Sequence, residues 1–126
     1  MIPPDLLYTP QHEWLLVQPN GNVRVGITDF AQDALGDIVF VALPGTGDEV
    51  AAEQAMGEVE STKSVSEVYA PIPGRIVRRN DAVETAPETI NDDPYGEGWL
   101  VEIEPEVAID GAEFLDAASY QALVQA

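Results

Sequence analysis

Short runs of apolar residues, several of them alternating with polar ones, dominate the chain and predict a mainly β protein. Leu15–Gln18 and Val23–Ile27 flank Asn20-Gly21, a pair typical of a two-residue hairpin turn. The continuous apolar run Ile38–Leu43 predicts a strand that is buried on both faces, or nearly so. Further strands are expected at residues 57–61, 64–69, 74–79 and 99–104.

Two short helices are expected among these strands. Thr28-Asp29 offers an N-cap to a segment that ends at Gly36, and Asp116 is suited to cap the Ala-rich segment Ala117–Gln125. Asn91–Gly98 is rich in Asp, Pro and Gly, which predicts a loop.

Length and composition favour one domain over residues 1–126, with 45% hydrophobic residues to form a core. The chain has no cysteine, so disulfides, thiolate nucleophiles and zinc–thiolate sites are excluded. The segment Met1–Leu7 has no basic n-region or apolar h-region, and no apolar run approaches the roughly 18 residues that span a bilayer. We therefore expect a cytoplasmic protein.

The net charge of −18 arises from 23 acidic and 5 basic residues spread along the whole chain. Such a charge repels nucleic acid and anionic lipid, which makes both poor partners. It favours docking onto basic protein surfaces. It is equally typical of a protein adapted for solubility or for a salt-rich cell.

Lys63 is the only lysine, and the remaining basic residues are arginines. A primary amine can be acylated, whereas a guanidinium is a permanently charged and poor nucleophile, so a modified lysine is one hypothesis. The β-branched residues around it lie between the breakers Gly57 and Pro71, which predicts two strands that meet at Thr62-Lys63, on an exposed hairpin tip. The alternative is replacement of lysine by arginine elsewhere, which leaves Lys63 as an ordinary solvated charge.

The residues offer little for catalysis. His12 is the only histidine, so a histidine metal cage is excluded, and the chain lacks a phosphate-binding glycine loop with its lysine and a nucleophile elbow. Serines flank Lys63, but an exposed hairpin would not desolvate the amine enough to make it a base. Trp14 and Trp99 are expected to be core or cleft-wall residues. We expect a protein without catalytic residues or a metal site.

Several segments in register resemble the H protein of the glycine cleavage system over residues 6–124. They are Tyr8–Trp14, Val25–Pro44, Gly47–Val50, Val59–Pro71, Asp93–Leu100 and Leu115–Tyr120. The resemblance implies a barrel-sandwich hybrid fold related to lipoyl and biotinyl domains, and lipoate bound through an amide to Lys63. Two residues depart from the family pattern: Thr62 stands where Val is usual, and Glu67 where Asp is frequent.

The resemblance also implies a carrier function. The lipoyl group would accept an aminomethyl group from glycine at the pyridoxal-phosphate-dependent P protein and deliver it to the T protein. The L protein, a dihydrolipoyl dehydrogenase, would then reoxidise the dithiol, and lipoylating enzymes would be further partners. In such a system the cofactor does the chemistry and the chain presents it. By resemblance, the loaded arm folds back towards the segment His12–Trp14, where Glu13 and Glu67 are candidates to hold its cationic amine.

Two other functions fit the sequence. A lipoyl relay protein, which donates lipoyl groups to other enzymes, would share the fold and Lys63, and an acidic non-catalytic binding module would need no modification. Biotin is disfavoured because biotin carriers typically place the lysine between two methionines, whereas Thr62 and Ser64 flank Lys63 here.

Overall fold

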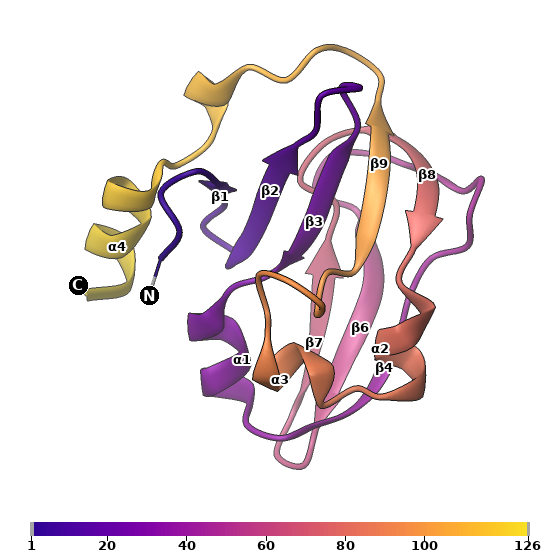
Figure 1. Cartoon of the computed structure of the whole chain (residues 1–126), viewed down its shortest axis with the longest axis vertical. Coiled ribbons are helices and arrows are strands. Elements are labelled where there is room, and N and C mark those ends of the chain that lie inside the picture. Colours follow the sequence, from indigo (N-terminus) through magenta and orange to yellow (C-terminus); the bar gives the residue numbers. More distant parts are fainter. Residues whose placement is uncertain (1, 126) are drawn as a thin grey trace.

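The computed structural model describes residues 2–125 and contains two antiparallel sheets (Figure 1). The six-stranded sheet has, in spatial order, β1 (Leu7–Tyr8), β2 (Glu13–Val17), β3 (Val23–Ile27), β9 (Val101–Pro105), β8 (Gly74–Arg79) and β5 (Glu49–Val50). The three-stranded sheet has the order β4 (Ile38–Ala42), β6 (Ala55–Ser61) and β7 (Val65–Tyr69).

One hydrophobic core joins the two sheets. Val41, Val59 and Val68 from the three-stranded sheet are buried in the same cluster as Val25 and Ile103 from the larger sheet. Burial of this apolar area is the main favourable term in folding. The result is mainly β, with short helices that include a C-terminal one, and confirms the barrel-sandwich hybrid expected from the sequence.

Most strands lie where the apolar pattern predicted them. The hairpin of β2 and β3 forms, but its loop has three residues, 19–21, and is not a two-residue turn. The Gln18 N–H donates to the Asn22 carbonyl at 2.9 Å, and Gly21 has a φ of +89°, a conformation that favours glycine. Strand β8 matches its predicted range, while β6, β7 and β9 begin or end within two residues of theirs. The two-residue strands β1 and β5 were not predicted because they are too short to show a periodic pattern.

The expectation that Ile38–Leu43 is buried on both faces is wrong. Val39 and Phe40 are 52% and 53% exposed. Strand β4 forms one edge of its sheet, and the register shifts between Ile38 and Phe40. Such an irregularity changes which side chains face the core. Val39 and Phe40 are therefore both exposed, although they are consecutive in the strand.

Both predicted helices are present with the predicted caps. Helix α1 (Asp29–Leu35) begins where the Thr28 hydroxyl accepts a hydrogen bond from the backbone N–H of Ala31 at 3.2 Å. Helix α4 (Ala117–Gln125) begins where the carboxylate of Asp116 accepts one from Ser119 at 2.8 Å. No helix between residues 2 and 125 is long and apolar enough to cross a membrane.

Two further helices and a 3₁₀ turn were not predicted. They are α2 (Asp81–Thr85), α3 (Thr89–Asp92) and the turn at Gly111–Glu113. Helix α3 takes up the first two residues of the predicted loop at 91–98, so that prediction is wrong there. The four-residue helix is held by tertiary contacts: the Asn91 amide donates hydrogen bonds to Gln32 in α1 and to the Gly36 carbonyl. The sequence pattern within so short a helix does not reveal such contacts with distant residues.

Helix α4 secures the segment that leads into β2. The Tyr120 hydroxyl lies 2.7 Å from His12 Nδ1 and 2.8 Å from the Thr28 hydroxyl. Its ring stacks on Tyr8 with centroids 4.7 Å apart. The C-terminal helix therefore holds β1 and the start of β2 in place, beside each other in Figure 1.

We expect Tyr120→Phe to lower the free energy of unfolding by about 1 kcal/mol, because the hydroxyl links two polar groups while the stacked ring is retained. Urea unfolding monitored by circular dichroism measures the change. Gln121→Ala, on the exposed side of the same helix, serves as the control. Equal stability of the two variants would show that the hydroxyl does not hold this segment.

Candidate functional site

Lys63 lies exposed at the tip of the hairpin formed by β6 and β7, as the sequence predicted. The hairpin projects beyond the body of the molecule at the bottom of Figure 1. The β6–β7 ladder continues to Ser61, whose N–H donates to the Ser64 carbonyl at 2.7 Å, so the turn is Thr62-Lys63 as the sequence predicted. The Ser61 hydroxyl accepts hydrogen bonds from the backbone N–H groups of Lys63 at 3.1 Å and Ser64 at 3.0 Å. These side-chain bonds replace the Asn-Gly turn chemistry that the sequence lacks.

The lysine side chain crosses the C-terminal end of α1 at Gly36. A Cβ atom at Gly36 would lie 3.0 Å from Lys63 Cε and 3.5 Å from Nζ, so the glycine leaves the space that the lysine occupies. Gly36 also has a φ of +85°, which favours glycine. The next residue, Asp37, accepts a hydrogen bond from the Thr62 N–H at 3.1 Å, which fixes this turn to the hairpin tip.

The Lys63 amine is not part of any ion pair among the residues that the structure describes. The ion pairs found there all involve arginines of β3 and β8. The tip therefore presents an accessible amine on an ordered backbone. Sequence reasoning identified the amine but missed Gly36 and Ser61; the glycine that ends α1 was visible in the sequence, whereas its contact with Lys63 was not.

Glu13 is buried, with 2% of its surface exposed. Its carboxylate accepts a hydrogen bond from the Thr9 hydroxyl at 2.7 Å and another from the backbone N–H of Tyr69 at 3.2 Å. Burial raises the pKa of this carboxyl, although both hydrogen bonds act in the opposite direction. Two neutral donors thus leave part of the carboxylate free to accept a further, cationic donor.

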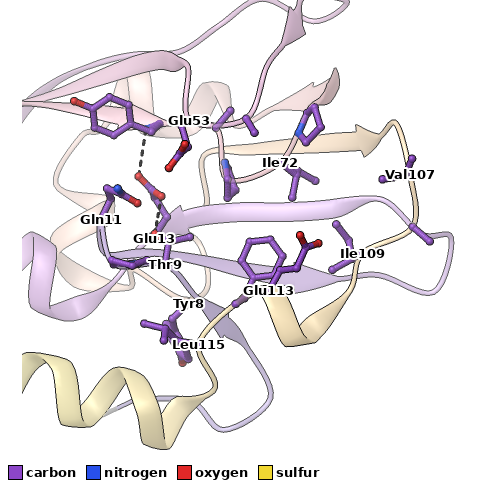
Figure 2. Close-up of a pocket in the computed structure, with 18 residues that line it drawn as sticks. Tyr8, Thr9, Gln11, Glu13, Glu53, Ile72, Val107, Ile109, Glu113 and Leu115 are labelled. Carbon is purple, nitrogen blue, oxygen red and sulfur yellow. Dashed lines mark hydrogen bonds between the residues drawn. The ribbon is translucent and has the colours of Figure 1, made fainter.

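A cavity of about 400 Å³ opens beside Glu13. Figure 2 shows the side chains of Gln11 and Glu53 beside that carboxylate, and Ile72 and Ile109 farther along the wall. The cavity therefore has a polar, acidic part and an apolar part. Such a space suits a ligand with a cationic end and an apolar body.

Glu67 does not line this cavity. It lies exposed on the outer side of β7, directly opposite Glu58 of β6. Its negative charge is the largest cause of the raised pKa of Tyr69. Tyr69 thus contacts Glu13 through its backbone and interacts with Glu67 through its side chain. Glu13 of β2 meets β7 at Tyr69, two residues from Glu67, but the structure does not bring the two predicted carboxylates into one pocket.

A mainly β fold of two sheets that presents one lysine at a hairpin tip defines a carrier domain of the barrel-sandwich hybrid class. The model of the glycine cleavage H-protein family matches residues 6–126, and the chain belongs to this family. Members of the family are the lipoyl carriers of the glycine cleavage system. The resemblance found in the sequence is therefore confirmed.

Individual relatives agree over almost the full chain. The glycine cleavage system H protein of Mycolicibacterium smegmatis is 55% identical over 126 residues, which cover 98% of this chain and 96% of the relative. That of Psychrobacter sp. is 52% identical over 121 residues, 96% of each chain. A crystal structure of an H protein from Mycobacterium marinum superposes with a TM-score of 0.91 at 45% identity, and covers 99% of this chain and 100% of its own.

The raised pKa of Glu13 predicts a pH-dependent effect of Glu13→Gln on stability. The wild type should lose stability as the pH rises from about 4.3, the value in an unfolded chain, through the higher pKa of the folded state. The variant has no such charge: its amide oxygen can accept from the Tyr69 N–H while its NH2 group donates to the Thr9 hydroxyl, which reverses the bond to Thr9. We therefore expect Glu13→Gln to gain stability relative to the wild type with increasing pH.

Urea unfolding at a series of pH values tests this, with Glu106→Gln, an exposed position, as the matched loss of charge. The same pH dependence in both variants would show that burial of Glu13 is not the cause.

Proposed function

We propose that this protein is the lipoyl carrier of a glycine cleavage system, with the lipoyl group joined to Lys63 by an amide bond. The observation that supports the assignment most strongly is the position of the only lysine. In a chain of the H-protein family, Lys63 lies exposed at an ordered hairpin tip. A long group attached there extends from the protein body and can enter the active site of another enzyme.

The residues around Lys63 fit a lipoyl group. The amine is exposed, and the space at Gly36 accommodates the aliphatic part of the lysine. When bound, the group would supply a disulfide–dithiol couple able to carry the aminomethyl group of glycine from the P protein, where CO2 is lost, to the T protein, with NAD at the L protein as the oxidant that restores the disulfide. The chain itself makes and breaks no bonds in this scheme; its residues present and orient the arm.

We further propose that residues 1–126 act as one carrier domain with four kinds of partner: the P, T and L proteins and the lipoylating enzymes. Each must reach Lys63 at the same hairpin tip. The cytoplasmic location expected from the sequence stays a prediction.

Glu67 and Glu13 are proposed to hold the amine that the arm carries. A lysine joined to a lipoyl group spans about 14 Å when extended, at roughly 1.25 Å per bond. Four residues of β-strand span about 13 Å, so Glu67 lies within reach of an arm that follows β7. Glu13 meets the amide of Tyr69, six residues or about 20 Å from Lys63, so it is the weaker candidate, reached only when the arm leaves the line of β7. A carboxylate there would bind a cationic amine through a charge-assisted hydrogen bond and limit its contact with water.

Lys63→Arg should abolish lipoylation and all support of glycine cleavage, while the fold remains intact. The charge and the aliphatic stem are retained, but the acylatable amine is lost. Intact mass and peptide mapping after expression with lipoate measure the modification, and reconstitution with P, T and L proteins measures the activity. Undiminished activity of the variant would overturn the assignment of Lys63.

The same mass measurement separates the alternatives. A lipoyl increment on the wild-type Lys63 peptide supports either lipoyl role, and glycine cleavage in the reconstituted system distinguishes the carrier from a relay protein. A wild-type protein that stays unmodified under competent lipoylating conditions would favour the acidic binding module.

Glu67→Gln and Glu13→Gln should leave lipoylation near normal but shorten the lifetime of the loaded carrier in the absence of the T protein. We expect the larger effect for Glu67→Gln, because Glu67 lies within reach of the extended arm along β7, whereas Glu13 lies on β2, farther from Lys63. Release of formaldehyde and ammonia from the purified loaded carrier measures the lifetime, with Glu106→Gln as the control. Identical release rates in all proteins would assign both carboxylates to other roles.

A further inference from the structure

The outer side of the three-stranded sheet carries two large apolar side chains beside the lysine hairpin. Phe40 of β4 is paired with Glu60 of β6, and Glu60 is paired with Val65 of β7. Paired residues of an antiparallel sheet point to the same side, so the three form a row. Phe40 is 53% exposed and Val65 is 54% exposed. Glu60 lies between them, so the two exposed apolar side chains flank a carboxylate and do not form one continuous apolar patch.

The adjacent row contains an electrostatic conflict. Glu58 of β6 is paired with Ala42 on one side and directly with Glu67 on the other. Like charges in directly opposed positions destabilise a sheet. Among the residues that the structure describes, no ion pair includes Glu58, Glu60 or Glu67. A repulsion that the chain leaves uncompensated is typical of a surface whose complement lies on another molecule.

We define the hairpin face as the outward side chains of Phe40, Glu58, Glu60, Val65 and Glu67. We propose that the carrier docks through this face onto the enzymes that act on its arm, at an apolar patch bordered by lysine and arginine side chains. This inference rests on the proposed function, because it identifies the surface that accompanies Lys63 into an active site. Charge complementarity selects the partner: nucleic acid and anionic lipid would be repelled.

A second copy of this chain is a poorer occupant of the face. It would bring the same carboxylates, and its arginines are engaged with Glu102, Glu104, Asp81 and Glu84. A basic enzyme surface instead turns the repulsion between Glu58 and Glu67 into attraction, while Phe40 and Val65 bury their exposed area.

The apolar part of the proposal is tested by Val65→Thr and Phe40→Thr, with Val17→Thr as the matched control. Val17 is 46% exposed on β2, so the control makes the same change on a strand of the other sheet. The P protein is the probe. We expect the Kd of the unlipoylated carrier and the KM of the fully lipoylated carrier to rise about fivefold for Val65→Thr and about tenfold for Phe40→Thr. The kcat should stay within about twofold of the wild type, because docking rather than chemistry is altered.

The acidic part is tested by Glu58→Gln, with Glu106→Gln as the control for loss of one charge. Glu58→Gln removes a repulsion, so its urea midpoint should rise, yet its Kd for the P protein should increase and depend less on salt. A substitution at a residue with a purely structural role would not make the protein more stable and weaken its docking at the same time.

The outcomes separate this inference from the proposed function. A wild-type carrier that binds the P protein but is never lipoylated would overturn the proposed function alone. Equal Kd and KM values for Val65→Thr, Phe40→Thr and Val17→Thr would overturn the docking surface alone. If the two hairpin-face variants instead dissociate a dimer of the carrier, with Kd and KM unchanged, the face contacts a second copy and the proposal is wrong.

Discussion

The register between β6 and β7 is the constraint on which the site depends. Pairing of Val59 with Ser66 and of Glu60 with Val65 buries one set of side chains and turns the alternate set to the outside. A shift by one residue would exchange the two sets and place carboxylates in the core. The same register brings the strands together at Ser61, whose hydroxyl organises the loop of Lys63. The pairing of β6 with β7 therefore determines both the packing of the core and the position of the Lys63 amine.

Charge is distributed unevenly over the two sheets. The arginines lie on β3 and β8 of the six-stranded sheet, where Arg24 and Arg78 share the buried carboxylate of Glu102 and both contact the Trp99 ring. The three-stranded sheet carries carboxylates without such partners among the described residues. The four arginines thus pair with carboxylates on or beside the larger sheet, while the other carboxylates, including those of the three-stranded sheet, are spread along the chain. The carboxylates of the three-stranded sheet remain available to attract a basic surface to the hairpin.

Several residues far from Lys63 in the sequence hold its surroundings. Asn91 of α3 accepts a hydrogen bond from Ile38 and donates one to the Gly36 carbonyl, which fixes the turn beneath the lysine. Tyr120 fixes the segment before β2, and with it Glu13. A carrier must present its arm in the same way to every partner, and an ordered scaffold lowers the entropic cost of each docking event.

The sequence by itself determined the mainly β fold, both capped helices and the hairpin of Lys63, because alternation, caps and breakers are local signals. It also indicated the family, since several motifs lie in register along the chain. Only the tertiary structure decided that Phe40 is exposed, that Glu13 is buried against Tyr69, and that Glu67 lies outside the cavity. These outcomes depend on which strand forms an edge and on which segments meet across the core. Contacts between residues distant in the chain leave no periodic pattern in the sequence, so they become visible only when the sheets are assembled.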